Sequence, residues 1–365
     1  MNPLISVIVP LYNRADVIKE TVASVQGQTY PHWELIVVDD GSKDGSDAVV
    51  QAFAEQDKRI RFYRRDREPN GGSACRNIGF EKSTGSYVIF LDSDDVLAPF
   101  CLEHRLEHFA QYPDKDCLVF PPAIFSTTPE EAYRLWNRLV KPNEMSDLDR
   151  FLATDAPWQT TGPIWKREAL LRVGPWMEGI RCRQDLEFHV RALIMGINYR
   201  KFPEVYDYFY RRSPKGAQIS KGDFVDEDYI RSKNYVFGKL QEYLVRDGKL
   251  DFFRTQMMCS YYLETALGNY QYNHRIPLGE FLGPISRLKL LPFTDKARSI
   301  LFVGVLYLLR ALVGVRYSMF LFNRRFRALP SFFLYTRYDR EVKLTDEDRR
   351  KYLQRLNRST TARTP

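Results

Sequence analysis

The chain of 365 residues has little cysteine and no arrangement of it that would build a framework. It contains five cysteines, an odd number, and no two of them form a CxxC pair. This argues against a disulfide scaffold and a zinc site, and it is typical of a reducing compartment. Internal repeats and low-complexity segments are also lacking, and the first residues have neither the basic segment nor the long apolar run of a signal peptide. We therefore expect a cytoplasmic protein.

The overall composition is that of a globular protein, with 44% hydrophobic and 27% charged residues. The length allows one large domain or two smaller ones. A net charge of +8 is compatible with anionic lipid, nucleic acid or phosphorylated substrates. Because the basic residues are dispersed through the first 300 positions, we expect no nucleic-acid partner.

Strand-like and helix-like segments alternate in the first part of the chain. We expect Asp16 to cap the first helix and Ala52 to lie on the buried side of the second. Buried strands are expected at Ile5–Leu11, Trp33–Val38 and Ile60–Arg64. A strand, a helix and a strand within about 40 residues form a βαβ unit, which predicts an α/β fold with a parallel sheet.

An apolar run at Tyr87–Leu91 ends in three carboxylates, those of Asp92, Asp94 and Asp95. Alternate residues of a strand face opposite ways, so Asp92 and Asp94 could project together from its carboxyl end. Open α/β sheets bind ligands at that edge. Clustered carboxylates repel one another unless a cation compensates, and their oxygens suit Mg²⁺ or Mn²⁺. The alternative is a solvated acidic turn.

A glycine turn precedes this strand and leads into a helix at residues 70–77. The N-terminus of a helix presents free N–H groups that suit a phosphate, and Arg76 adds a bidentate donor. The alternative is an ordinary loop with a surface arginine.

The order of these pieces resembles the family 2 glycosyltransferases, which have the nucleotide-binding GT-A fold with a mostly parallel central sheet. The resemblance covers residues from about 5 to about 220. It rests on VIVPLYN at 7–13, VVDDGS at 37–42, RN at 76–77, FLDSDD at 90–95 and QD at 184–185. Each motif is weak alone, but together in this order they are specific.

The resemblance implies a set of donor-binding residues. Asp40 would read the nucleotide base, typically uracil, in a pocket that includes Pro10 and Tyr12. Arg76 would lie near the diphosphate of the nucleotide-sugar donor. The acceptor would be a sugar or a lipid-linked molecule, as in cell-surface polysaccharide or glycolipid synthesis.

The resemblance also implies a metal site and a catalytic base. Asp92 completes the acidic motif on the donor side, Asp94 would contact the ribose and the metal, and Asp95 would ligate the same Mn²⁺ or Mg²⁺ ion. Asp185 matches the base that deprotonates the acceptor hydroxyl in a single inverting displacement. A purely helix-capping role is the alternative for Asp185.

Three departures from the family pattern bear on these roles. Gln184 replaces the glutamate that often precedes the base. The segment at 211–215 lacks the histidine that helps hold the metal in many members, and its cations Arg211, Arg212 and Lys215 could hold phosphate instead. No QxxRW motif follows, which disfavours a processive polysaccharide synthase.

Two other function classes are open. The LDSDDV sequence at 91–96 also fits the nucleophile motif of a haloacid-dehalogenase-type phosphatase, with acidic residues near Gly222 as partners. A non-catalytic nucleotide-sugar-binding module would need Asp40 and Asp94 but not Asp185.

Residues 1–222 are therefore expected to form the catalytic domain, and residues 223–365 a helical C-terminal region with a charged tail. Residues 299–322 are mostly apolar but contain Arg310 and Arg316. An uninterrupted apolar run of about 20 residues would be needed to span a bilayer. We expect this segment to hold the protein peripherally on the anionic inner face of the membrane, with burial in a helical subdomain as the alternative.

Overall fold

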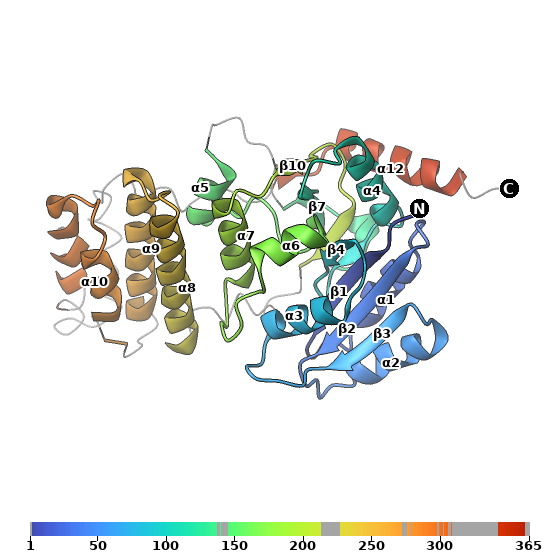
Figure 1. Ribbon diagram of the computed structural model, residues 1–365, viewed down its shortest axis with the longest axis horizontal. Helices are drawn as coiled ribbons and strands as arrows, with labels where there is room; N and C mark the ends of the chain where they lie inside the picture. Colours follow the sequence, from blue (N-terminus) through green and yellow to red (C-terminus); the bar gives the residue numbers. More distant parts are fainter. Residues whose placement is uncertain are drawn as a thin grey trace.

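The catalytic part of the chain is organised around a seven-stranded sheet with the order β10-β6-β9-β4-β1-β2-β3 (Figure 1). The computed structural model describes residues 2–136, 139, 145–212, 227–271, 276–277, 279–297, 299–301, 303–305, 308 and 342–361. The strands are β1 (Ile5–Leu11), β2 (Trp33–Asp39), β3 (Ile60–Arg64), β4 (Tyr87–Phe90), β6 (Cys117–Val119), β9 (Pro163–Lys166) and β10 (Tyr199–Lys201). Strand β9 runs antiparallel to β4 and β6, and the other pairings are parallel. The predicted α/β fold with a mostly parallel sheet is confirmed.

Helices cover both faces of this sheet, which explains why its central strands are almost wholly apolar. The helices of this part are α1 (Ile18–Gln26), α2 (Ser46–Gln56), α3 (Gly72–Lys82), α4 (Cys101–Gln111), α5 (Asp147–Leu152), α6 (Arg167–Val173) and α7 (Gln184–Ile194). Val7 and Val9 share a buried cluster with Val22 of α1. Ile8, one position between them, faces α3 and lies so close to Gly79 that a Cβ there would meet it at 2.4 Å. Alternation along β1 therefore packs two helices on opposite faces.

Two local predictions about helices α1 and α2 are wrong. The residue before α1 is Val17 rather than Asp16, and no side chain caps this helix. In α2, Val50 is buried and Ala52 is exposed. The buried side of α2 runs from Ser46 to Val50, one turn apart, which turns Ala52 towards solvent.

A second sheet of five strands, ordered β12-β8-β7-β11-β5, lies beside the acidic motif. Its strands are β5 (Val96–Leu97), β7 (Pro122–Phe125), β8 (Arg134–Leu135), β11 (Tyr208–Arg211) and β12 (Val342–Lys343), and the 3₁₀ turn η1 (Pro129–Glu131) precedes β8. Strand β5 begins at the residue after Asp95 and pairs with β11. The second sheet therefore fixes the carboxyl side of the acidic motif.

The C-terminal helices α8 (Glu227–Arg246), α9 (Phe252–Gln271) and α10 (Gly279–Ser286) pack on one end of the molecule (Figure 1). Their core is continuous with that of the catalytic part, because Phe188 of α7, Phe237 of α8 and Leu263 of α9 belong to one buried cluster. The boundary near residue 222 stays a prediction, since that residue lies outside the described part of the chain. None of the described helices is long and apolar enough to cross a membrane.

The charged tail packs against the catalytic part of the chain. Strand β12 pairs antiparallel with β8, and helix α12 (Asp346–Thr361) then lies against the catalytic part near α4 (Figure 1). Tyr352 of α12 stacks on Tyr206 with ring centroids 4.8 Å apart. Charged residues dominate the tail, but Leu344 is buried, and Tyr352 and Leu356 pack against the same cluster.

Candidate functional site

The acidic motif lies where β4 ends, at the carboxyl edge shared by the parallel strands β1, β2 and β4. Asp92 and Asp94 are half-buried, and Asp95 is only 1% exposed. The motif thus combines carboxylates that face outward with one that faces the interior. This is the edge at which the sequence predicted a ligand site.

Each of the two outward carboxylates is paired with an arginine. Arg76 Nη2 donates to Asp92 Oδ1 at 2.7 Å, and Arg14 Nε lies 3.5 Å from Asp94 Oδ2. Burial raises the pKa of Asp94, and the neighbouring charge of Asp92 raises it further. These carboxylates repel one another, so positive charge beside them is stabilising. Sequence reasoning missed Arg14, although it directly follows the VIVPLYN motif.

Asp95 is held inside the protein by two hydrogen bonds. Its Oδ1 accepts from the backbone N–H of Arg211 at 3.2 Å, and its Oδ2 accepts from the hydroxyl of Thr161 at 2.9 Å. Burial, followed by the charges of Asp94 and Asp92, raises the pKa of Asp95 well above its ordinary value. Because Asp95 is only 1% exposed, these contacts fit a supporting role, and direct ligation of a metal by Asp95 stays a prediction.

Arg211 is likewise committed to the architecture of the site. Its Nε donates to the backbone carbonyl of Asp94 at 3.0 Å, and its Nη2 pairs with Glu20 at 2.5 Å. The guanidinium therefore braces the acidic loop, and the contacts do not support the alternative that it holds phosphate. The predicted alternative at Lys215 lies outside the described residues.

Thr161 connects Asp95 to a buried ion pair between Arg105 and Asp207. Arg105 donates to the Thr161 carbonyl at 3.0 Å and to both oxygens of Asp207 at 2.9 and 2.8 Å. Both charged side chains are 0% exposed. The pair fixes the backbone from which Thr161 supports the acidic motif, and no sequence motif announces it.

We expect Arg105→Met to lower the free energy of unfolding by about 3–5 kcal/mol, because Asp207 would keep a buried charge whose remaining side-chain contacts include His104 at 3.3 Å. Urea denaturation measures the loss. Arg172→Met is the matched control, since Arg172 pairs with Asp116 at the surface and such pairs contribute about 1 kcal/mol or less. Equal losses in the two variants would contradict the assigned role.

Arg76 joins three elements of the site. Besides Asp92, it binds Gln184 at the start of α7, where its Nη1 donates to Oε1 at 2.9 Å, and it lies over the ring of Trp176. The glycine turn makes room for this contact, since a Cβ on Gly72 would lie 3.1 Å from both Arg76 Nη1 and Gln184 Oε1. Gln184 thus brings the first turn of α7 to the acidic motif.

Asp185 lies in that first turn and is half-buried. Its Oδ1 accepts from the N–H of Leu186 at 2.8 Å, a group that has no partner within the helix. This contact is the one that the capping alternative requires, and it leaves Oδ2 available for a second role. The catalytic and capping interpretations both stay predictions.

The predicted base-binding region is built by loops that follow β1 and β2. Asp40 accepts from Arg65 Nε at 2.5 Å and from the N–H of Gly71 at 2.9 Å, which ties it to the turn before α3. Gly71 has φ +120°, a conformation that favours glycine. Tyr12 is 51% exposed at the end of the same edge and is free to contact a planar ligand. Pro10, at the end of β1, is half-buried.

A divalent cation fits this donor set only in part. No group of three or more acidic, histidine or cysteine side chains that could hold a metal occurs among the described residues. Asp92 and Asp94 supply carboxylate oxygens, and Mg²⁺ is often held by one or two carboxylates together with substrate phosphates. The arrangement suits a cation whose remaining ligands come from a bound diphosphate.

Comparison with known proteins decides the family. The family model described as glycosyl transferase family 2 matches residues 6–172. Through this segment the chain belongs to glycosyl transferase family 2. The matched segment includes Asp40, Arg76 and the whole acidic motif. Family membership leaves the phosphatase alternative unsupported.

One curated relative of this family 2 protein is TuaG of Bacillus subtilis (strain 168), which is named as a glycosyltransferase of teichuronic acid biosynthesis. The two are 46% identical over 105 residues, which is 29% of this chain and 41% of TuaG. The match thus spans less than half of that relative, so it does not extend to the activity of the whole protein.

Solved structures support the fold of this family 2 protein. TarS 1–349 of S. aureus, in complex with UDP-GlcNAc, aligns with a TM-score of 0.58 at 16% identity and covers 98% of this chain and 92% of its own. The mannosyltransferase PcManGT of Pyrobaculum calidifontis, in complex with GDP-Man and Mn²⁺, aligns with a TM-score of 0.52 at 16% identity, covering 100% and 89%. At these identities the likeness extends to the fold alone.

Proposed function

We propose that this protein is an inverting glycosyltransferase that moves a sugar from a nucleotide-diphospho-sugar, preferably a UDP-sugar, to an acceptor hydroxyl. The observation that carries the proposal is the position of Arg76, which binds both the acidic motif and the first turn of α7. A donor diphosphate beside Arg76 would lie between the carboxylates of the motif and Asp185.

In the proposed donor complex, the loops after β1 and β2 bind the nucleotide. Asp40, already fixed by Arg65 and Gly71, has further acceptor positions on its oxygens for an N–H of the base. Pro10 and Tyr12 supply apolar surface in the same pocket. Rigid support of Asp40 reduces the entropy lost on binding.

The leaving diphosphate develops negative charge, and Arg76 is the protein group placed to stabilise it. Bound Mn²⁺ or Mg²⁺ would neutralise the same oxygens, with Asp94 and Asp92 holding the ion. In the present contacts, Arg14 and Arg76 neutralise the carboxylates of Asp94 and Asp92. When the ion is bound, both arginines would be available to the diphosphate instead. Asp95 would hold the acidic loop in place through its hydrogen bonds to Thr161 and Arg211.

Asp185 is proposed as the general base. A sugar hydroxyl is a poor nucleophile, and a positioned carboxylate contributes about 10²–10⁴-fold to its reaction. Gln184 contributes no negative charge beside it.

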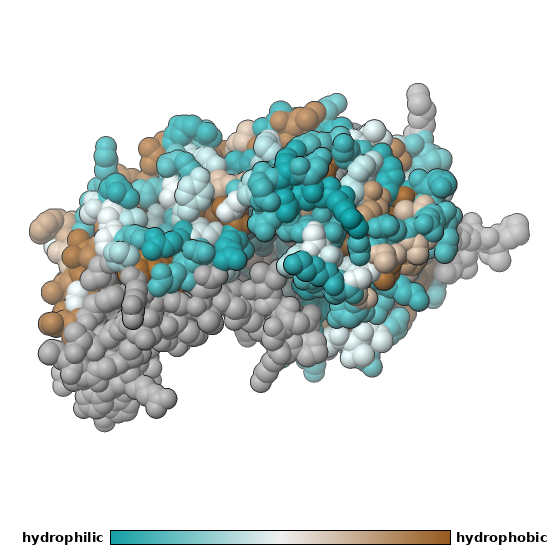
Figure 2. Space-filling model, turned by 90° about the horizontal axis from the view of Figure 1, so that it is seen from below, coloured by the Kyte–Doolittle hydropathy of each residue, from teal (hydrophilic) through white to brown (hydrophobic). Residues whose placement is uncertain are grey.

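The proposed acceptor is a sugar or lipid-linked glycan used in cell-surface polysaccharide synthesis. The name of TuaG, a relative in sequence, supports this class of product. We also propose peripheral attachment to the inner face of the membrane. Most of residues 299–327, predicted to mediate it, lie outside the described part. Leu301 and Leu308 of this segment are 66% and 60% exposed, and Phe293 just before it is 84% exposed. Figure 2 shows hydrophobic surface gathered at the end of the molecule that carries α9 and α10.

A screen of nucleotide-sugar donors tests the proposed function. The full chain is incubated with each donor, with Mn²⁺ or EDTA, and release of the nucleoside diphosphate is measured. We expect release from a UDP-sugar that requires Mn²⁺. Saturable donor binding without turnover, even with glycan acceptors present, would favour the non-catalytic binding module.

A further inference from the structure

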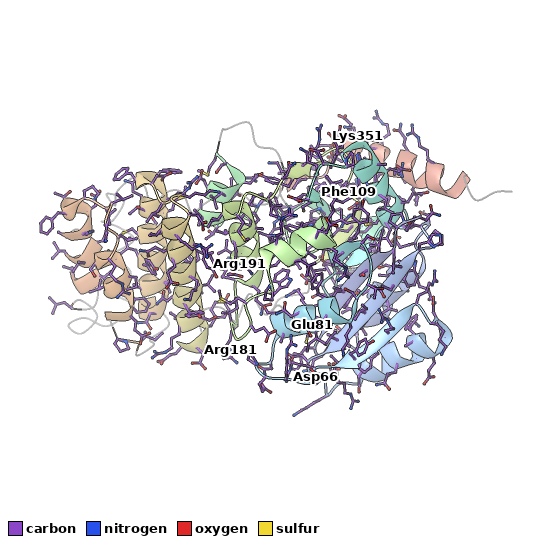
Figure 3. All side chains as sticks on the ribbon, in the orientation of Figure 1. Asp66, Glu81, Phe109, Arg181, Arg191 and Lys351 are labelled. Atoms are coloured by element: carbon purple, nitrogen blue, oxygen red, sulfur yellow. The ribbon has the colours of Figure 1, made fainter. Side chains whose placement is uncertain are left out.

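A cavity of about 500 Å³ lies away from the acidic motif, between α4, the segment around β10, and α12. Its volume is in the range of sites that bind small molecules. None of the predicted donor, metal or catalytic residues lines it. Lys351 on α12 lies close to α4 at this place in Figure 3. The cavity exists only because the C-terminal tail folds back onto the catalytic part.

Both walls of the cavity are fixed by packing. The β12–β8 pairing anchors the start of the tail, and Tyr352 stacks on Tyr206 with an angle of 4° between the rings. Arg355 of α12 pairs with Glu107 of α4 at 2.7 Å. These contacts therefore hold the walls of the cavity in place.

Basic residues outnumber acidic ones in the lining. It contains five arginine and lysine side chains against two glutamates. Of these, Glu107 is already neutralised by Arg355, Lys201 pairs with Asp147 at 2.7 Å, and Lys351 pairs with Glu347 of its own helix at 2.8 Å. Arg200 forms no ion pair within the described part of the chain, and it is held by stacking on the ring of Tyr112 at 4.0 Å. A guanidinium oriented in this way matches the geometry of phosphate oxygens.

Two polar atoms on lining residues have no hydrogen-bond partner among the described residues, Nδ1 of His108 and Nε of Arg355. Unpaired buried polar atoms are costly and call for an explanation. The aromatic rings of Tyr112 and Phe202 complete the wall beside the cations. Cations next to aromatic faces suit a ligand with an anionic group and a ring.

The geometry points to a second ligand site in this cavity, one that binds a phosphate-bearing molecule of about the size of a sugar phosphate. Arg200, Lys351 and Arg355 bind the phosphate, and the sugar lies against Tyr112 and Phe202. The cavity is much larger than a phosphate ion, so the ring contributes to affinity. This inference goes beyond the proposed function and does not depend on it.

Isothermal titration of the full chain with glucose 1-phosphate tests the site, in the presence of saturating UDP and Mn²⁺ so that donor-site binding is blocked. The double variant Arg200→Gln/Lys351→Gln is compared with Arg246→Gln/Lys58→Gln. The control removes the same two charges from exposed positions, and Arg246 also stacks on a tyrosine, at 5.4 Å from the ring of Tyr243. Neither pair lies in the proposed catalytic machinery.

We expect saturable binding that is at least tenfold weaker in the cavity variant and unchanged in the control, because charged hydrogen bonds are lost. Inorganic phosphate should bind at least tenfold more weakly than glucose 1-phosphate. Equal affinity of the two double variants would overturn the proposal, and so would equal affinity for the two ligands. The proposal also fails if the cavity variant loses only binding to phosphatidylglycerol vesicles, because the basic face would then be a membrane surface.

Discussion

Asp185→Asn is expected to lower turnover by about 10²–10⁴-fold while the affinity for UDP stays close to that of the wild type. The amide keeps the shape of the side chain and can still accept the N–H of Leu186 through its oxygen. It can no longer take a proton from the acceptor hydroxyl. The change therefore separates the chemical role of Asp185 from its place at the helix terminus.

The measurement combines initial rates, calorimetric UDP affinity and thermal unfolding. Asp228→Asn provides the control, because Asp228 lies in the first turn of α8 and undergoes the same change of charge at a helix N-terminus. A capping role predicts similar and small losses of stability in both variants, with turnover preserved. Normal turnover of the Asp185 variant would thus reject it as the base.

Asp94→Asn is expected to abolish the Mn²⁺-dependent part of UDP affinity, whereas Asp95→Asn should leave it largely intact. Asp94 is accessible and bears one arginine at 3.5 Å, which a cation can replace. Asp95 is inside, and asparagine can make the same two contacts: its oxygen accepts from Arg211, and its amide donates to Thr161. Both variants replace an aspartate by asparagine, so they differ only in which carboxylate of the acidic motif is removed.

Calorimetric titration with UDP, with Mn²⁺ or EDTA, measures this difference. Thermal unfolding shows that each variant is folded. If Asp95→Asn unfolds normally yet loses the Mn²⁺ dependence, Asp95 is a ligand as the sequence predicted, and the interpretation of its buried contacts is wrong. If neither variant changes the dependence, the acidic motif is not the metal site.

Much of the fold was accessible from the sequence because its signals are local. The apolar runs of β1 and β2 predicted buried strands, and the position of the acidic motif directly after β4 predicted a site at the carboxyl edge of a parallel sheet. The spacing of motifs from residue 7 to residue 185 was sufficient to recognise the family. The sequence was less reliable for single positions of a helix: Asp16 does not cap α1, and Ala52 of α2 is exposed.

The sequence by itself thus determined the α/β fold, the family and the edge that carries the acidic motif. Only the tertiary structure decided which partner each carboxylate has: Arg76 for Asp92, Arg14 for Asp94, and Thr161 with Arg211 for Asp95. It also decided that the charged tail returns to the catalytic part and closes a cationic cavity. These contacts join residues far apart in the chain, and the pattern of one segment carries no information about which distant segment will pack against it.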